Sequence, residues 1–378
     1  MIDLFQPQAG DDELAAVAAV FADRWLGHGP RSTAFEAAFA DHIGARPEHL
    51  LFVNSGTAGL FLAAELLGLE PGDEVVLPSP SFVGAANAVL RAGGRPVFCD
   101  VDARTLNPTA EHIEAAVTPR TRAVIVLHYG GHPGDIARIA AHCRAAGRTL
   151  VEDCACSVAS RVDGRAVGTF GDLAMWSFDA AKVLTTGDGG MLYVRDAGLA
   201  ARARRLAYHG LVQPTGLGHA KVSHRWWDPD VPEPGRREIG NDLTAAIGTV
   251  QLRRLPAFLA RRKEIVELYD RELAGFDAVR VPPPLPAGHR SSYFFYWVQM
   301  AAGLRDQVAS ALFREGIYTT FRYAPLHKIP LYGTGGPDLP GAERAAAQTL
   351  CLPLHPGLTD ADVRTVAAAL RKAVEASA

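Results

Sequence analysis

Short apolar runs alternate with helix-like apolar spacing from about Leu50 to Val194, and this alternation constrains the fold more than any other feature. The runs are Leu50–Val53, Glu74–Leu77, Pro96–Cys99, Ala123–Leu127, Thr149–Glu152, Leu173–Trp176 and Met191–Val194. Between the first five lie stretches with helical spacing, Thr57–Leu67, Phe82–Ala92, Ala110–Val117 and Ile136–Ala146. Strands that alternate with helices predict a largely parallel sheet covered by helices on both faces, which is the α/β fold class.

Several of the predicted strands are followed by polar residues. Asn54-Ser55 follows the first strand, Asp100 the third, His128 the fourth and Asp153 the fifth. In open α/β sheets, ligands bind at the carboxyl ends of the strands. We therefore expect a binding site at this edge of the sheet.

Lys182 lies just past the predicted strand Leu173–Trp176 and shortly after Ser177, and the Gly-rich turn 187–190 and the strand Met191–Val194 follow it. A lone lysine is most often a solvated surface charge. A lysine between core strands is instead expected to be desolvated, and desolvation lowers the pKa of an ammonium group. A neutral amine can form a Schiff base with an aldehyde, which is the covalent route of pyridoxal phosphate enzymes.

The composition argues against several classes of function. The net charge is −3 and no basic stretch interleaves with aromatic residues, so nothing favours nucleic acid as a partner. No apolar run approaches the roughly 20 residues that cross a bilayer, and the N-terminus lacks the pattern of a signal peptide, so we expect no membrane contact and a cytoplasmic protein. The cysteines are odd in number and scattered, and Cys154-Ala155-Cys156 has no second Cys or His pair at zinc-like spacing. We therefore expect reduced thiols and no metal.

The pattern changes after the last of these strands. Ala197–Ala207 has helical spacing, whereas Gly210–Arg237 is rich in Gly, Pro, Trp and His and predicts an irregular excursion. A long helix is expected over Asp242–Glu272, with a kink or break at Pro256.

The rest of the chain predicts a second, smaller unit. It has a candidate strand over Tyr293–Met300 and candidate helices over Ala342–Leu350 and Ala361–Ala376. With 378 residues, the chain exceeds the usual size of one core. We expect a large domain over residues 1–250 and a small α+β domain over residues 251–378.

Three further features are site candidates, each with an ordinary structural alternative. Small residues at Gly56-Thr57 open a helix and expose backbone N–H groups that favour a phosphate, although Ser55 or Thr57 could simply cap that helix. Phe82 could stack on a flat heterocycle or join the core. Asp153 ends a buried strand and needs a cationic partner, which could be a protonated pyridine nitrogen or an arginine.

A series of short motifs runs in one order along nearly the whole chain. They are Gly27-His28-Gly29-Pro30 with Phe35-Glu36, Asn54-Ser55-Gly56-Thr57-Ala58, Pro96-Val97-Phe98-Cys99-Asp100, His128-Tyr129-Gly130, Glu152-Asp153, Gly168-Thr169-Phe170-Gly171-Asp172, Ser177-Phe178 with Lys182, Ala245-Ala246-Ile247-Gly248, Gln251-Leu252, Tyr323-Ala324-Pro325-Leu326-His327 and Leu352-Pro353. This order resembles the sugar aminotransferases of the DegT/DnrJ/EryC1/StrS family. The resemblance implies the aspartate-aminotransferase-like fold (fold type I) for the large domain and pyridoxal 5′-phosphate as cofactor.

The resemblance also implies a role for each candidate residue. Lys182 would form the internal aldimine and later carry the proton between the substrate Cα and the cofactor C4′. Asp153 would pair with the pyridine nitrogen and keep it protonated, so that the ring can hold carbanion charge. The other implied contacts are Gly56, Thr57 and Ser177 to the phosphate, Phe82 over one ring face, and Tyr323 and His327 near the sugar substrate.

The sequence departs from the family pattern at three positions. Cys156 stands where the family often has Gln or His near the cofactor's 3-oxygen, so either a weaker hydrogen bond or a substitute residue is expected there. Asp179 occupies a place often held by His or Tyr. Arg237 falls where an Asn or Lys usually reaches across the dimer to the phosphate, and an arginine can make that contact bidentately. Asn241 is the rival for this contact, and Arg237 could also be a solvated surface charge.

We therefore predict a homodimeric aminotransferase that moves an amino group from glutamate to a keto group on a nucleotide-linked deoxysugar, for a natural product or a surface glycan. The family's shared active site and the irregular segment Gly210–Arg237 favour the dimer. A family subgroup that dehydrates sugars at C3 has His at the lysine position, which Lys182 disfavours. Two alternatives stay open: a free cyclitol ketone as substrate, and a non-catalytic binding protein that kept the scaffold.

Overall fold

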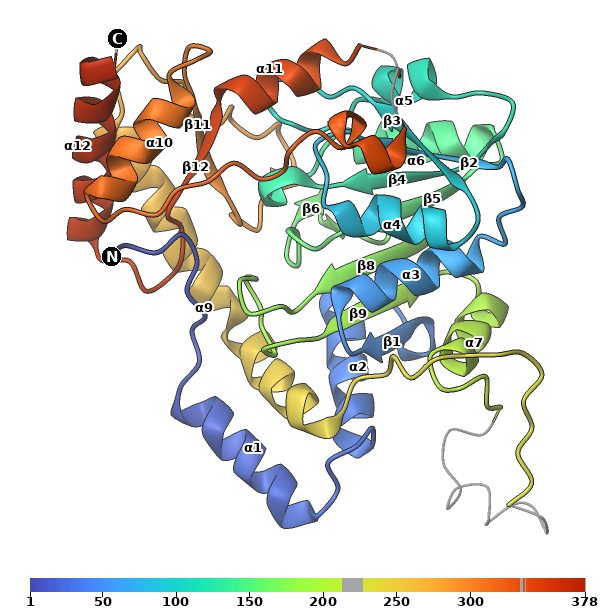
Figure 1. Ribbon diagram of the computed structural model, residues 1–378. Helices are drawn as coiled ribbons and strands as arrows, with labels where there is room; N and C mark the ends of the chain where they lie inside the picture. The colour runs from blue at the N-terminus through green and yellow to red at the C-terminus, as the bar shows by residue number, and fades with distance from the viewer. Residues whose placement is uncertain (213–226, 334–335, 337, 378) are drawn as a thin grey trace.

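The computed structural model describes residues 1–212, 227–333, 336 and 338–377, so half of the expected excursion Gly210–Arg237, residues 213–226, lies outside the described residues. Its main feature is a seven-stranded sheet in the order β1-β9-β8-β5-β4-β2-β3 (Figure 1). The strands are β1 (Leu50–Val53), β2 (Glu74–Pro78), β3 (Arg95–Cys99), β4 (Thr121–Leu127), β5 (Thr149–Asp153), β8 (Leu173–Ser177) and β9 (Gly190–Val194). Neighbouring strands are parallel except at β9, which runs antiparallel to β1 and β8. The predicted α/β fold with a mostly parallel sheet is confirmed.

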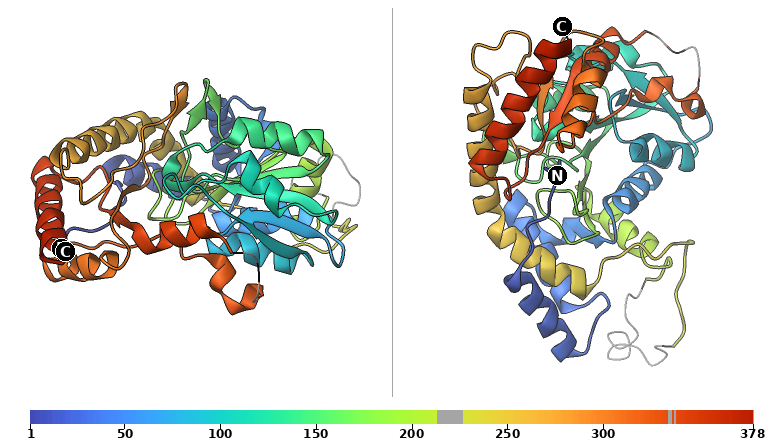
Figure 2. Two further views of the ribbon diagram at one scale, coloured as in Figure 1. Left: turned by 90° about the horizontal axis from the view of Figure 1, so that it is seen from above. Right: turned by 60° about the vertical axis from the view of Figure 1, so that its left-hand side comes forward.

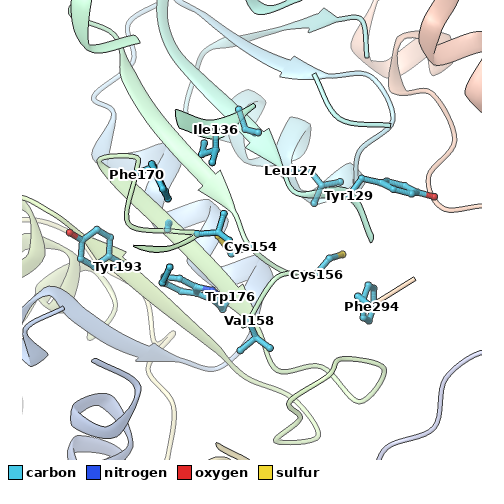
Figure 3. Close-up of a cluster of buried hydrophobic side chains, with 14 of the residues drawn as sticks. Leu127, Tyr129, Ile136, Cys154, Cys156, Val158, Phe170, Trp176, Tyr193 and Phe294 are labelled. Carbon is cyan, nitrogen blue, oxygen red and sulfur yellow. The ribbon is translucent and has the colours of Figure 1, made fainter. Parts of the chain in front are cut away.

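The sheet is buried on both faces because successive side chains of a strand point into two different cores. In β1, Phe52 joins one hydrophobic cluster and Val53 the other. The first cluster is covered by α2 (Pro30–Ile43), α5 (Ala110–Ala116) and α6 (Ile136–Ala145), and the second by α3 (Gly56–Leu66), α4 (Val83–Arg91) and α7 (Ala197–Leu206). Figure 3 shows part of the first cluster, with Cys154 and Trp176 at its centre.

A third core lies in the C-terminal part of the chain. It is built from β11 (Tyr296–Gln299), β12 (Thr349–Leu352), α10 (Arg305–Arg314) and α12 (Asp360–Ser377), whereas the nearby α11 (Pro340–Gln348) places Ala342 and Ala345 in the two cores of the large sheet. β11 and β12 pair antiparallel, and the predicted strand and two helices are present. The predicted helix over Ala342–Leu350 is two residues too long, because the chain becomes extended at Thr349 and pairs with β11.

The helix α9 (Asp242–Glu272) joins the large sheet unit to the C-terminal core (Figure 2). It packs against α1 (Asp11–Asp23) and α2 near its start and against α12 near its end. A kink or break was predicted at Pro256; the helix does not break there, because it continues through this residue. The lost backbone hydrogen bond is offset by burial of Leu255 and Phe258 on either side.

The predicted boundary between residues 250 and 251 falls inside α9. Along this helix the buried side chains pass from the first core at Leu255 to the third core at Ile265. We keep the division into residues 1–250 and 251–378 as a proposal.

Two smaller features complete the fold. A three-stranded sheet, in the order β10-β6-β7, is formed by β6 (Arg161–Val162), β7 (Arg165–Ala166) and β10 (His289–Arg290). The N-terminus lies on the C-terminal unit, where Ile2 pairs with Ile317 (Figure 1). Within the described ranges, none of the helices has the length and apolar character that spanning a bilayer requires.

Candidate active site

A cavity of about 360 Å³ opens at the carboxyl ends of the central strands, at the sheet edge where the sequence predicts a site. Its lining comes from the starts of α3 and α4, the ends of β5 and β8, the turn after β8, and the loop around residue 322. The predicted site residues that line it are Gly56, Thr57, Phe82, Asp153, Ser177, Lys182 and Tyr323. Three predicted residues, Cys156, Arg237 and His327, are not part of this lining.

The N-terminus of α3 forms one end of the cavity. Ser55 caps the helix by accepting a hydrogen bond from the Ala58 N–H at 3.0 Å, so the capping alternative holds for this residue. The N–H groups of Gly56 and Thr57 have no acceptor within the helix and stay free for an anion. A Cβ atom at Gly56 would lie 2.9 Å from the Ser177 Oγ, so only glycine lets this hydroxyl approach the helix end. The two elements together form an anion cradle.

Asp153 forms the deepest wall and is 1% exposed. Its Oδ1 accepts a hydrogen bond from the Ala155 N–H at 3.0 Å. Burial raises the pKa of this carboxyl, and the Ala155 hydrogen bond and the charges of Lys182 and His128 partly oppose that rise. A cation bound against Asp153 would favour its ionised form.

Lys182 lines the cavity with its side chain half-buried. Its Nζ lies 4.7 Å from the centre of the Phe294 ring. The expected enclosure between core strands is therefore only partial, because Lys182 lies in a turn after β8 and its N–H donates to the Asp179 carbonyl at 2.9 Å. Asp179 shapes the same turn by accepting a hydrogen bond from the Ala181 N–H. The amine is thus accessible to a small molecule in the cavity.

Glu152, the neighbour of Asp153, faces the opposite side of the sheet. Its carboxylate accepts hydrogen bonds from the Gly168 N–H at 2.7 Å and the Gly171 N–H at 2.5 Å, and contacts the His128 Nε2 at 3.1 Å. With Cys154 and His128 it forms a buried group whose ligand-type atoms lie within 4.8 Å of one another. Because backbone donors already occupy both carboxylate oxygens, we interpret this group as structural.

Phe82 and Tyr323 both line the cavity and lie next to each other. Phe82 is 43% exposed, and its ring centre lies 5.8 Å from that of Tyr323. The Tyr323 hydroxyl shares a hydrogen bond with the thiol of Cys156, which is fully buried behind the cavity wall. Burial raises the pKa of this thiol to about 11, so Cys156 is protonated at neutral pH. Its partner in this structure is Tyr323.

His327 lies outside the cavity lining and fixes the loop that carries Tyr323. Its Nδ1 lies 2.5 Å from the Ser79 Oγ and its Nε2 lies 3.3 Å from a Glu343 carboxylate oxygen. The neighbouring Leu326 N–H donates to the Ser79 carbonyl at 2.9 Å. These contacts support a positioning role for His327 in this loop, and a contact of His327 with the substrate stays a prediction.

The two candidates for a contact across a dimer also lie outside the cavity lining of this chain. Arg237 is exposed, and its guanidinium lies 5.3 Å from the centre of the Tyr208 ring. The side chain of Asn241 caps α9 by accepting a hydrogen bond from the Thr244 N–H at 3.0 Å. A contact of either residue with a partner's cofactor stays a prediction.

Arg322 lines the cavity and was missed by the sequence reasoning. Its guanidinium lies 5.1 Å from the centre of the Phe5 ring. The one available signal was its place directly before Tyr323, in a motif that the sequence analysis had already singled out.

The comparison with family models decides what kind of protein this is. The model of the DegT/DnrJ/EryC1/StrS aminotransferase family matches residues 7–371. The chain belongs to this family. The predicted family, fold and enzyme class are thereby confirmed: the protein is an enzyme, a sugar aminotransferase of a pyridoxal phosphate-dependent family.

Individual relatives cover almost the whole chain. The dTDP-4-dehydro-2,3,6-trideoxy-D-glucose 4-aminotransferase of Saccharopolyspora spinosa is 59% identical over 375 residues, which are 99% of this chain and 97% of the relative. The crystal structure of the aminotransferase TlmJ from Streptoalloteichus hindustanus is 58% identical and has a TM-score of 0.95, covering 100% of this chain and 99% of TlmJ. A PLP-form structure of Spr1654 from Streptococcus pneumoniae is 25% identical with a TM-score of 0.90, covering 100% and 99% of the two chains.

Proposed function

We propose that the enzyme transfers an amino group from L-glutamate to the C4 keto group of a deoxysugar linked to thymidine diphosphate. The observation that carries the proposal is the meeting of the Lys182 amine, the buried Asp153 carboxylate and the Gly56–Ser177 cradle in one cavity. The substrate class is supported by the Saccharopolyspora spinosa relative, whose name specifies a dTDP-linked 4-keto sugar. The product, an amino sugar, suits the synthesis of a natural product or a surface glycan.

The cavity fits pyridoxal phosphate at each end. The cradle of Gly56, Thr57 and Ser177 matches a phosphate, because helix N–H groups and a hydroxyl converge where a larger residue at position 56 would clash. The desolvated carboxylate of Asp153 matches the protonated pyridine nitrogen, which would favour the ionised form that burial opposes. Lys182 lies on the same wall and would hold the aldehyde carbon covalently. When bound, the cofactor supplies an electron sink for carbanion charge.

The remaining groups bind, orient or move protons. Lys182 would take the proton from the donor carbon that carries the amino group and would deliver it at the cofactor C4′, as a positioned general base and acid. Phe82 would cover one face of the cofactor ring. Tyr323, fixed by Cys156, borders the space for the sugar and excludes water from it.

The proposal includes a homodimer in the cytoplasm. The helix α1 exposes Leu14 and Phe21, and Trp25 is exposed just after it; these are large apolar side chains that a partner subunit would cover. Arg237 or Asn241 would then reach the partner's phosphate. The cytoplasm is supported by the cysteines, which are unpaired and buried.

A substrate panel tests the proposal. The purified enzyme with L-glutamate should aminate a dTDP-linked 4-keto sugar and leave a free cyclitol ketone unreacted. Lys182→Ala should lose the absorbance of the bound cofactor and nearly all turnover, whereas Lys263→Ala, at an exposed lysine of α9, should behave like the native enzyme.

Other outcomes of this panel separate the alternatives. Amination of the cyclitol alone would replace the nucleotide sugar as substrate. No conversion of the cofactor to its amine form with any amino donor would favour a non-catalytic binding protein. An unchanged cofactor spectrum in Lys182→Ala would remove that lysine from the chemistry.

A further inference from the structure

Arg322 is a positively charged residue of the cavity that has no role in the function proposed above. It is half-buried and lines the same cavity as Lys182. Most buried or half-buried arginines of this fold have a carboxylate partner; Arg254, for example, pairs with Glu13 at 2.7 Å. Over the described ranges, with their gaps at 213–226, 334–335 and 337, Arg322 forms no ion pair. Its guanidinium is instead packed against the ring of Phe5.

Arg322 and Lys182 line the same cavity from different segments, Arg322 from the loop around residue 322 and Lys182 from the turn after β8. Both charges act on the buried thiol of Cys156, where they oppose the rise in pKa that burial causes. Arg322 also acts on the hydroxyl of Tyr323, which lines the cavity, and on the buried thiol of Cys351. The charges acting on Asp153, in contrast, are those of Lys182 and His128. Arg322 is therefore close to the reacting amine without neutralising the carboxylate below it.

The loop that carries Arg322 is fixed at several points. Thr320 pairs with Cys351 of β12, and Pro325 pairs with Pro80 after β2. The contact of His327 with Ser79 closes the same loop from the other side. Because the loop is anchored on both sides of Arg322, its guanidinium is presented in a defined place, which favours recognition of a planar anion.

We propose that Arg322 binds the α-carboxylate of the amino-acid donor. This inference rests on the proposed transamination, in which a donor must place its amine-bearing carbon at Lys182. An α-carboxylate is one bond away from that carbon, so its receptor must lie beside the lysine. The diphosphate of a nucleotide sugar is separated from the reacting C4 by the sugar ring and would lie farther out. The cavity's other carboxylates, Asp179 and Asp188, are exposed and leave Arg322 available.

The two half-reactions of the enzyme separate the carboxylate from the diphosphate. The first converts the cofactor to its amine form with L-glutamate, and the second consumes that form with the keto sugar; each is followed by absorbance in a single turnover. In Arg322→Gln the glutamate concentration at half-saturation should rise about 10- to 100-fold, the range expected for a lost charge-assisted pair. The half-saturating sugar concentration should change less than about threefold. The half-saturating glutamate concentration of Arg322→Lys should lie between those of the native enzyme and Arg322→Gln, because lysine keeps the charge and loses the bidentate geometry.

A binding measurement removes the dependence on turnover. Calorimetric titration with 2-methyl-L-glutamate, which lacks the hydrogen that is removed in the reaction, should show weaker binding to Arg322→Gln by the same factor. Arg314→Gln, at an exposed arginine of α10, is the matched control and should bind like the native enzyme.

Each remaining outcome overturns a distinct statement. Native-like glutamate saturation and 2-methyl-L-glutamate binding in Arg322→Gln, with an active native enzyme, would refute the carboxylate assignment alone. Weaker saturation by the keto sugar only would assign Arg322 to the diphosphate and also refute it. A native enzyme without any half-reaction would overturn the proposed function, and the assignment with it.

Discussion

The cavity has two walls that are built in different ways. The sheet wall, formed by Gly56, Thr57, Asp153, Ser177 and Lys182, is placed by strand ends and a helix start, so the backbone topology fixes it. The loop wall, residues 321–328, depends on contacts between single side chains, such as those of Arg322 with Phe5 and His327 with Ser79. We propose a matching division of roles, in which the sheet wall would perform the chemistry and the loop wall would set which substrates fit.

The largest expected effect comes from replacing the two neighbouring carboxylates at the end of β5, Asp153 and Glu152, one at a time. Asp153→Asn should lower kcat/KM at least about 100-fold, because an amide cannot match a developing or fixed positive charge. The free energy of unfolding should be unchanged or higher, since a buried carboxylate with a raised pKa is removed. Steady-state kinetics and denaturant unfolding measure the two quantities.

Glu152→Gln is the matched control for Asp153→Asn. We expect it to lower the stability of the fold and to leave the cofactor site intact. It weakens the acceptor for the Gly168 and Gly171 N–H groups, so we expect a loss of about 1–3 kcal/mol in the free energy of unfolding. The cofactor spectrum of the folded protein should be native. Equal losses of activity in Asp153→Asn and Glu152→Gln, measured on folded protein, would break the distinction between them.

A smaller effect is expected where the loop wall is attached. Ser79→Ala and His327→Gln should each lower the free energy of unfolding by about 1 kcal/mol, and their double variant should lose less than the sum, because both changes remove one contact. Glutamate should also saturate both variants at higher concentration, since Arg322 is no longer held. Strict additivity of the two changes would show that this contact does not anchor the loop.

The smallest effect concerns the junction between the large sheet unit and β11. His132 packs at 4.8 Å against Trp297, and burial lowers its pKa from 6.5 to about 4. The unfolded chain therefore binds a proton between these values that the folded protein excludes. The stability linked to His132 is complete above pH 6.5 and is lost as the pH falls toward 4.

His132→Gln removes this titration and leaves the rest of the acid response intact. The native protein should lose about 0.8 kcal/mol more than His132→Gln between pH 7.5 and pH 6, measured by urea unfolding at both values. Parallel pH profiles for the two proteins would contradict the burial of a neutral His132.

The sheet wall could be predicted from the sequence because its residues follow strands whose apolar runs are easily recognised. Asp153 and Ser177 stand at the ends of β5 and β8, and a parallel sheet brings such positions to one edge. The pattern was less informative about local environment. Lys182 was expected to be enclosed, but the turn in which it lies leaves it open to the cavity.

The loop wall could not be predicted in the same way. Its contacts join residues far apart in the chain, such as Ser79 and His327, which are 248 positions apart. No local sequence pattern predicts such contacts. The motif containing Tyr323 and His327 identified the loop, but gave neither the inward place of Arg322 nor the outward place of His327. The partner of Cys156 likewise emerged only from packing.

Borohydride reduction followed by peptide mapping tests the central claim, a covalent bond between Lys182 and pyridoxal phosphate, most directly. The reduced enzyme should carry one phosphopyridoxyl group, on the peptide that contains Lys182. Prior treatment with excess L-glutamate should release the cofactor from this lysine and prevent the label. An absent label, or a label on another lysine such as Lys328, would contradict the account.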